Sequence, residues 1–502
     1  MYIRGFLAML IPPLLTLGAP DLKLAWLTDI HVVEGNANAA MTAAAVAEIN
    51  AGDADAVILS GDLTGSGSTA ELKYVKTLLG KLEKPLLAIP GNHETNWSDN
   101  NCETFSELFD GDRFCRRIGN FVLAGIPSGP WLKMGDGYVR RSDLDWLDAA
   151  LNQTVKPGDR VIFICHYPLT QELSNAQDVL AVLKKYPVAA VLSGHYHNLE
   201  LLNSDGFGNA VGRAISLRHS TEKSGGYNLV ELTGDQVAVF NKTIGEKRPD
   251  APAIEFTAGK VPGIPVKFRP AEMEPPPPEL KFSGKMAEVL PPSKIESPYF
   301  KIAAGRCQAP PALRDNIAAF GAWDTFLYVL EADTGKLKWK WNNGSPNILF
   351  SPGNVTPVIG EKNLAVVAPD RYLTIFDRET GAIKLRTNQY KFRESLGPAA
   401  DGRRAYAKTM DGELVVIDVD AAEIEKVIDL GIGYEHTPVQ PCEAFGDVFA
   451  GGRQGDLVRV NPTDGKVKWR YRCGTSGFDR IEFDGKNVTA VMIDGSVWTV
   501  ER

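Results

Sequence analysis

The stretch Ala56-Val-Ile-Leu-Ser-Gly-Asp62 decides the fold of the first half of the chain, because a short apolar run ends abruptly on serine, glycine and a carboxylate. Apolar runs of this length suit strands of a sheet that is covered on both faces. Segments 39–49 and 70–82 have the composition and spacing of helices between such strands. The same strand pattern recurs at four further places, which end on polar residues: Leu22–Leu27, Pro85–Ile89, Arg160–Ile164 and Val188–Leu192.

The polar residues that follow these runs form short motifs. In α/β sheets, ligands bind outside the carboxyl ends of the strands, so we expect these side chains to share one cleft. Glycine or another turn residue accompanies the motifs, which turns each side chain out of the core. The motifs are Thr28-Asp29-Ile30-His31, Gly61-Asp62, Gly91-Asn92-His93-Glu94, Cys165-His166 and Gly194-His195-Tyr196-His197.

Composition and the first residues bound the class of protein. The chain has 502 residues and a net charge of −8, so two or three domains are expected and a nucleic-acid backbone binder, normally basic, is not. Residues 1–19 read as a cleavable signal peptide, with Arg4, an apolar run and small residues at Gly18-Ala19. The run is too short to span a bilayer comfortably, and no later segment has transmembrane character. We therefore expect a secreted or periplasmic protein.

Beyond the α/β region (20–245), the composition changes twice. Segment 246–300 holds twelve prolines, including Pro275–Pro278, and is predicted to be an extended linker. Region 301–502 is a repeat array in which a short strand recurs at spacings of 46, 41, 43 and 40 residues, beginning at Leu327, Leu373, Leu414, Leu457 and Val497. A period near forty with several strands per unit is typical of a β-propeller.

Each repeat continues with a turn such as Asp333-Thr-Gly335 and a second strand that often carries tryptophan, as at Trp339 and Trp469. The units resemble the PQQ-like propeller repeat, and about five are visible. Quinone enzymes have longer arrays, so we expect a scaffold or binding module that caps the active-site cleft or binds a protein or cell-surface partner, not a cofactor domain.

Six cysteines are present. An exported protein can form disulfides, and Cys102 and Cys115, which flank a short polar loop, are the expected pair. Cys165 follows an apolar strand and is expected to be a buried thiol. The pairing of Cys307, Cys442 and Cys473 stays open.

Histidine is scarce, with seven in the chain, and five lie in the motifs at the strand ends. The ordered set Asp-x-His, Gly-Asp, Gly-Asn-His-Glu, His, Gly-His-x-His resembles the calcineurin-like metallophosphoesterase superfamily over residues 22–200. The resemblance implies an αββα sandwich of two sheets with a centre of two metal ions. It assigns Asp29, His31 and His197 to one metal, Asn92, His166 and His195 to the other, and Asp62 to both.

The chemistry of these residue types agrees with that assignment. Imidazole and carboxylate suit divalent or trivalent metals of intermediate hardness, and the resemblance implies Fe, Zn, Mn or Co. Two such ions can clamp a phosphate and lower the pKa of a bridging water. In the family a bridging hydroxide attacks phosphorus, and His93, which is not a ligand, acts as general acid or charge stabiliser near the leaving oxygen. Glu94 is expected to support the ligands from behind.

The predicted function is hydrolysis of an extracytoplasmic phosphate ester, and the motifs serve monoesters and diesters alike. The alternative is a binding protein that acts through its propeller and carries an idle metal site. Structural histidines are a poor explanation for five in family order. Several further residues could contact substrate or could simply be packed or solvated: Trp97, Trp131, Arg116, Arg117, Arg140, Arg141 and His219. His436 is expected to be structural.

Overall fold

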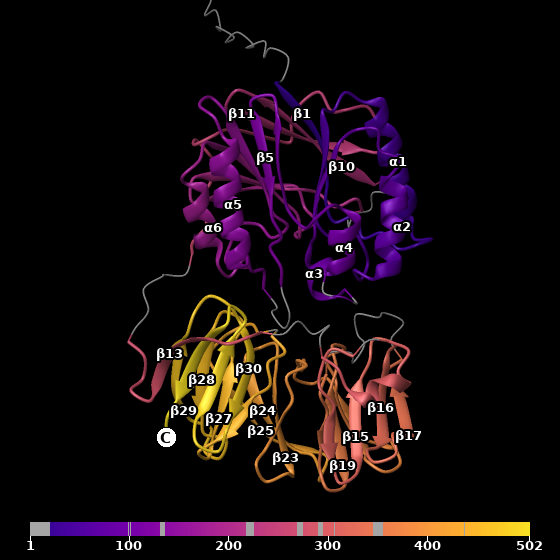
Figure 1. Ribbon diagram of the computed structural model, residues 1–502, viewed down its shortest axis with the longest axis vertical. Coiled ribbons are helices and arrows are strands. Elements are labelled where there is room, and N and C mark those ends of the chain that lie inside the picture. Colours follow the sequence, from indigo (N-terminus) through magenta and orange to yellow (C-terminus); the bar gives the residue numbers. More distant parts are fainter. Residues whose placement is uncertain are drawn as a thin grey trace, which may run out of the picture.

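The computed structural model describes residues 21–502 except 99, 101, 131–135, 217–224, 269–274, 290–294, 306, 345–354 and 436. Two domains follow one another, an α/β domain and a domain of five antiparallel sheets (Figure 1). The proposed signal peptide, Trp131, His219 and His436 fall outside the described residues.

The α/β domain contains two six-stranded sheets. The first has the order β12 (Ile254–Thr257), β11 (Gln236–Thr243), β10 (Gly226–Thr233), β1 (Leu22–Leu27), β2 (Ala56–Ser60) and β3 (Leu86–Ile89). The second has the order β4 (Phe114–Ile118), β5 (Phe121–Gly125), β6 (Arg160–Ile164), β7 (Val188–Ser193), β9 (Phe207–Val211) and β8 (Glu200–Ser204). Strands β1, β2 and β3 are parallel, as are β5, β6, β7 and β9, so each set ends at a common edge.

Helices cover the outer faces of both sheets. They are α1 (Ala37–Ala51), α2 (Thr69–Leu79), α3 (Asn92–Asn96), α4 (Glu103–Leu108), α5 (Arg141–Thr154) and α6 (Ala176–Leu183). The inner faces meet in one apolar core, in which Trp26 and Ile58 of the first sheet pack with Leu123 and Ile162 of the second. The predicted αββα sandwich is confirmed, and the fully apolar strands reflect burial on both faces.

The second domain contains five four-stranded sheets within the described residues, as the repeat period predicted. Sheet 1 is β14 (Ala312–Arg314), β15 (Ile317–Gly321), β16 (Phe326–Glu331) and β17 (Leu337–Asn342), and sheet 2 is β18 (Val358–Ile359), β19 (Asn363–Val367), β20 (Leu373–Asp377) and β21 (Ile383–Thr387). Sheet 3 is β22 (Gly397–Pro398), β23 (Arg404–Lys408), β24 (Glu413–Asp418) and β25 (Glu423–Asp429), and sheet 4 is β26 (Cys442–Ala444), β27 (Asp447–Gly451), β28 (Asp456–Val460) and β29 (Val467–Arg472).

Sheet 5 is assembled from two distant parts of the chain. Three of its strands are consecutive: β30 (Phe478–Phe483), β31 (Val488–Met492) and β32 (Ser496–Val500). The fourth is β13 (Leu280–Met286), which precedes the other four sheets of this domain in sequence. Shared apolar clusters join each sheet to the next, for example Phe376 between sheets 1 and 2 and Phe478 between sheets 4 and 5. The propeller-like all-β domain is therefore confirmed.

The proline-rich segment does more than connect the domains. It contributes β12 to the edge of the first sheet, β13 to the edge of sheet 5, and the 3₁₀ helix η2 (Pro298–Ile302). Both strands occupy edge positions, where few ladder hydrogen bonds are required and nearby proline is tolerated.

The disulfide predicted between Cys102 and Cys115 is wrong, because all six cysteines are free thiols. Cys102 is buried in the core beneath the helices of the first sheet, whereas Cys115 lies on β4 and its Sγ contacts Thr154. Cys165 is fully buried, as predicted.

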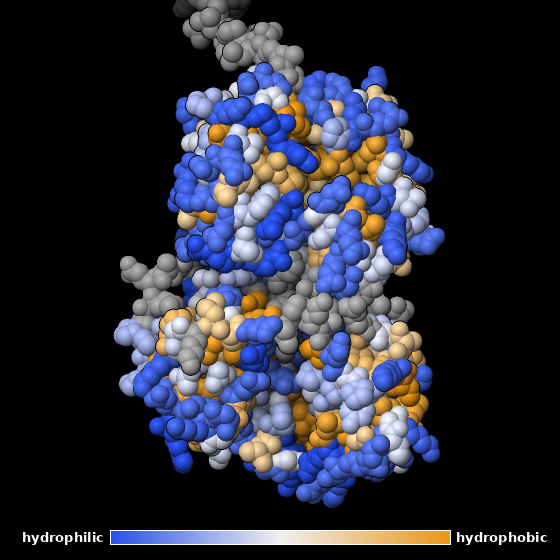
Figure 2. All heavy atoms as spheres, viewed as in Figure 1, coloured by the Kyte–Doolittle hydropathy of each residue, from blue (hydrophilic) through white to orange (hydrophobic). Residues whose placement is uncertain are grey.

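On the face shown in Figure 2 hydrophilic residues dominate the surface. Within the described residues, no helix is long and apolar enough to traverse a bilayer.

Candidate metal centre

All eight residues predicted for the site follow the carboxyl ends of β1, β2, β3, β6 and β7: six lie in loops, and Asn92 and His93 begin α3. The parallel strands of each sheet end at the same edge, and these two edges bring loops far apart in sequence into one cluster. The side chains form two groups that share one aspartate. The first group is Asp29, His31, Asp62 and His197, and the second is Asp62, His166 and His195.

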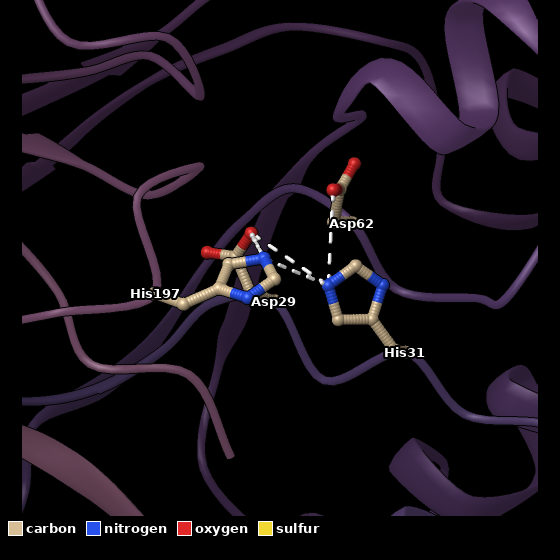
Figure 3. A group of neighbouring side chains, drawn as sticks. All are labelled: Asp29, His31, Asp62 and His197. Atoms are coloured by element: carbon tan, nitrogen blue, oxygen red, sulfur yellow. Dashed lines mark hydrogen bonds and ion pairs between the residues drawn. The ribbon is translucent and has the colours of Figure 1, made fainter. Parts of the chain in front are cut away.

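In the first group, one ligand-type atom from each residue lies within 4.8 Å of the others. His31 Nε2 and His197 Nε2 approach to 3.1 Å, and His197 Nε2 lies 3.2 Å from Asp29 Oδ1 (Figure 3). Ring nitrogens aimed at one another beside a carboxylate are what a metal ion requires, because each offers a lone pair to a common point.

The second group gains a further donor from Asn92. Its Oδ1 lies 3.0 Å from His166 Nε2 and 3.0 Å from His195 Nδ1. Asn92 begins α3, so the amide oxygen is presented from a helix N-terminus directly after β3. One oxygen and two imidazole nitrogens thus converge on the side of Asp62 away from the first group.

Asp62 lies between the two groups. Its Oδ1 is 3.3 Å from His166 Nε2, and its Oδ2 is 3.9 Å from His31 Nε2. One carboxylate oxygen therefore faces each group, which is the arrangement of a bridging ligand. The donor set fits two ions, with three further donors on each side of the shared carboxylate.

Contacts behind the donors fix their orientation. His166 Nδ1 lies 2.9 Å from the Ser60 carbonyl, which can only accept, so Nδ1–H donates and Nε2 faces the cluster. Asp29 accepts from Thr28 Oγ1 at 2.7 Å and from the His195 amide at 3.0 Å. The carboxylate of Asp29 thereby ties the loop after β7 to the loop after β1.

Glu94 fastens two loops together, a role that the sequence indicated only in outline. Its Oε1 accepts from the amides of Leu63 and Thr64 and from Thr64 Oγ1, while Oε2 accepts from the Gly91 amide. Glu94 is fully buried. It binds the loop that carries Asp62 to the loop that carries Asn92.

The backbone at the site is strained. Five non-glycine residues of the cluster have positive φ, a region that L-residues rarely adopt, and strain of this kind gathers at functional sites. They are Asp29 (49°), His31 (42°), Asp62 (53°), His195 (72°) and His197 (63°).

Two motif glycines allow the close approach of these loops. A Cβ at Gly91 would lie 2.2 Å from Asp62 Oδ1, and a Cβ at Gly194 would lie 2.5 Å from Asp29 Oδ2. Either contact would displace the carboxylate of a candidate ligand.

Charge and burial shape the protonation of the cluster. Burial favours the neutral form of imidazole and lowers the pKa of His195 to about 3 and that of His93 to about 4. Burial alone would raise the pKa of Asp29. The hydrogen bond of Asp29 with His197 and the positive charge of His166 outweigh burial and lower this pKa to about 2. Ionised carboxylate and neutral imidazole are the forms that bind metal.

His93 lies at the edge of the cluster and differs from the donors. Its Nδ1 is 2.9 Å from the Gly65 carbonyl, and its Nε2 is 3.4 Å from Asp62 Oδ2. The ring contacts His31 at 4.5 Å on one side and Trp97 at 4.2 Å on the other, measured between centroids. Trp97 thus reaches the site through His93.

Tyr167 was missed by the sequence analysis. Its ring stacks on His195 with centroids 4.0 Å apart. The position directly after His166 was the available signal.

The arginines considered as phosphate contacts are otherwise occupied or exposed: Arg117 pairs with Asp159, Arg140 with Asp112 and Asp143, Arg141 with Asp145, and Arg116 is exposed.

Known families match both parts of the chain. Residues 22–199 match the calcineurin-like phosphoesterase family, and residues 293–426 match the family described as outer membrane protein assembly factor BamB. The α/β domain is therefore a calcineurin-like phosphoesterase domain, and the repeats are of the PQQ-like type, as the motifs predicted.

Curated relatives align with the phosphoesterase domain. A probable cyclic nucleotide phosphodiesterase of Ruthia magnifica subsp. Calyptogena magnifica is 28% identical over 156 residues, 29% of this chain and 63% of the relative. The glycerophosphodiester phosphodiesterase GpdQ of Enterobacter lignolyticus is 30% identical over 171 residues, 29% of this chain and 57% of the relative. The chain thus spans about three fifths of the length of these relatives. The crystal structure of BamB from Moraxella catarrhalis aligns at 13% identity and a TM-score of 0.31, over 55% of this chain and 94% of that one.

Proposed function

We propose that this protein is a metal-dependent phosphodiesterase that hydrolyses a phosphate ester outside the cytoplasm. The observation that carries the proposal is the convergence of seven donor side chains in two groups that share Asp62. The names of the relatives, which include cyclic nucleotide and glycerophosphodiester phosphodiesterases, support a diester substrate. The character of residues 1–19 supports export.

The residues present fit two metal ions of intermediate hardness, such as Fe, Zn, Mn or Co. Asp29, His31 and His197 would hold one ion, Asn92, His166 and His195 the other, and Asp62 both. When bound, the pair supplies Lewis-acid polarisation of the phosphate and a water of lowered pKa.

Two further side chains, His93 and Glu94, would place a proton and fix the loops of the site. His93 does not belong to either group of donors, and its Nδ1–H is engaged by the Gly65 carbonyl. Its Nε2 faces the cluster from α3, where the negative charge of a bound phosphate ester would favour a second proton on the ring, at this nitrogen, beside the leaving oxygen. The four hydrogen bonds to Glu94 keep the two loops that present Asp62 and His93 at a fixed distance.

The test is hydrolysis of bis-p-nitrophenyl phosphate and p-nitrophenyl phosphate by the full chain, after metal removal and again with Mn, Zn, Fe or Co restored. Asp62→Ala is the site variant. Asp447→Ala is the matched control, because Asp447 is equally buried but pairs with Arg459 and Lys468 in sheet 4.

We expect metal-dependent turnover of the diester in the wild type and the control, and its loss in Asp62→Ala. Faster turnover of the monoester would redirect the proposal to a phosphatase. Two bound metals without turnover of either ester would contradict it and favour the binding protein considered above.

A further inference from the structure

A polar contact from the propeller reaches the loop beside His93. Gln308, which precedes sheet 1, donates from Nε2 to the Ser98 carbonyl at 3.3 Å and accepts at Oε1 from Trp323 Nε1 at 2.8 Å. All three residues are buried. A buried carbonyl that loses its donor is costly, so Gln308 constrains the position of Ser98.

Ser98 connects this contact to the site. Its Oγ accepts from the Cys102 amide at 2.8 Å, so the residue is anchored from both domains. The preceding residue is Trp97, whose ring contacts the His93 ring at a centroid distance of 4.2 Å. A shift of Ser98 would therefore move the aromatic wall against which His93 rests.

A second contact lies on the opposite flank of the cluster. Arg453, between β27 and β28, makes an ion pair with Asp136 at 3.0 Å, and Gln454 Nε2 lies 3.3 Å from Asp136 and 3.1 Å from the Gln171 carbonyl. Asp136 is 3% exposed, and burial raises its pKa to about 7, whereas Arg453 and Gln454 favour its ionised form.

Asp136 is one residue from a contact with the site. Gly137 packs so closely on Tyr167 that a Cβ there would lie 2.6 Å from the ring, and its amide donates to the Glu172 carbonyl at 2.9 Å. The Tyr167 ring stacks on His195, with planes 29° apart. A series of contacts therefore leads from Arg453 to His195 through Asp136, Gly137 and Tyr167, and another leads from Gln308 to His93 through Ser98 and Trp97.

We propose that the propeller forms part of the hydrolytic site, with Gln308 and Arg453 as positioning residues that hold His93 and His195 through Trp97 and Tyr167. The inference rests on the proposed function for the identity of the reaction. In Figure 1 α3, which carries His93, lies at the end of its domain that faces the five sheets.

This arrangement accounts for the burial of polar side chains between the domains. A scaffold that only tethered the enzyme would not need buried contacts on both flanks of the catalytic cluster. Displacement of a catalytic group by about 1 Å can cost roughly a hundredfold in rate, so contacts one residue removed from the site can affect turnover. A ligand that pulled the propeller away from this face would lower activity without entering the site.

The test compares Gln308→Ala and Arg453→Ala with Arg403→Ala in the full chain. Arg403 is a matched control, because it also pairs with a buried aspartate, Asp418, but within sheet 3. Arg453→Lys is the conservative variant, which keeps the charge opposite Asp136. The readouts are kcat and KM for p-nitrophenyl and phenyl diesters, and the visible absorption of Co²⁺ bound to the site.

We expect Gln308→Ala to lower kcat about tenfold with little change in KM, and more for the phenyl ester, because His93 acts on the leaving oxygen and phenolate leaves less readily. Arg453→Ala is expected to shift the Co²⁺ absorption through His195, and Arg453→Lys to restore it. Arg403→Ala should match the wild type in both readouts.

The inference would be overturned if both variants kept the wild-type kcat for each diester and the wild-type Co²⁺ spectrum. It would also be overturned if Arg403→Ala lost as much kcat as they do, because that would indicate general destabilisation. A wild type that hydrolyses no ester would refute the proposed function instead. In that case the Co²⁺ spectra of Gln308→Ala and Arg453→Ala would still decide whether the propeller positions the metal centre.

Discussion

The two domains are built from similar short apolar strands but use the strand ends differently. In the phosphoesterase domain β1, β2 and β3 run parallel, as do β6 and β7, so the residues after them meet at one place. In the propeller consecutive strands are antiparallel, so the residues after them alternate between two ends of each sheet. Chain direction, more than the motifs themselves, therefore concentrates the chemically active side chains in one domain.

Buried aspartates show the same contrast. Asp62 faces three histidines within 4 Å, whereas Asp447 in the propeller faces Arg459 and Lys468. Imidazole nitrogens beside a carboxylate can bind a metal cation together with it, whereas a carboxylate among cationic side chains is already neutralised.

The largest effect is expected at the shared carboxylate. Asp62→Asn should reduce kcat/KM by about a thousandfold or more, because several kcal/mol of transition-state stabilisation depend on the metal pair and about 1.4 kcal/mol corresponds to tenfold in rate. Metal content by inductively coupled plasma spectrometry should fall below that of the wild type. Asp447→Asn should keep the wild-type kcat/KM and metal content. A loss of metal in Asp447→Asn would contradict the assignment of the metal centre to the first domain alone.

A smaller loss is expected at His93. His93→Ala should lower kcat by about a hundredfold, within the range for a general acid, and should leave the metal stoichiometry unchanged because His93 is outside the donor groups. The measurement combines steady-state kinetics with metal analysis of the same sample. Loss of a metal ion from His93→Ala would make this residue a ligand and exclude the assigned role.

A substitution in the propeller core should lower the free energy of unfolding without loss of metal. Leu280→Ala in β13 removes a side chain that is 1% exposed in the cluster between sheets 4 and 5, and should lower the free energy of unfolding by about 3 kcal/mol. Lys281→Ala on the same strand is the control, since its pairing with Glu501 is exposed and worth little. Urea unfolding measures both, and equal shifts would show that β13 is not packed as described.

The smallest effect concerns the cysteines, three in each domain. All six are free, so a reductant should leave the thermal unfolding midpoint of either domain unchanged. Thiol titration of protein unfolded without reductant should count six thiols. A count of four, with a midpoint that falls on reduction, would restore the pairing of Cys102 with Cys115 that the sequence suggested.

The site could be predicted from sequence because its information is local. Each donor lies within a few residues of an apolar strand, and the strand directions bring the donors together, so Asp29, Asp62 and His166 were identifiable without coordinates. The five sheets followed similarly from the period of the repeats. In both cases one short pattern repeats often enough to exceed chance.

What could not be predicted depends on contacts between distant segments. Gln308 meets Ser98 across 210 residues, and no pattern in either stretch indicates the other. The prolines of segment 246–300 suggested an irregular linker, yet edge strands form between them, because an edge strand needs only one neighbour. The false disulfide has the same origin, since nearness in sequence did not bring Cys102 and Cys115 together.

The pairing of β13 with β32 also orders the biosynthesis of the molecule. Residues 21–257 can leave the ribosome and fold while β13 still has no partner, because β32 is encoded more than two hundred residues after it. During that interval the phosphoesterase domain exists without a docked propeller. If Gln308 and Arg453 position the catalytic histidines, the enzyme remains slow until β32 has paired with β13 and the propeller has docked.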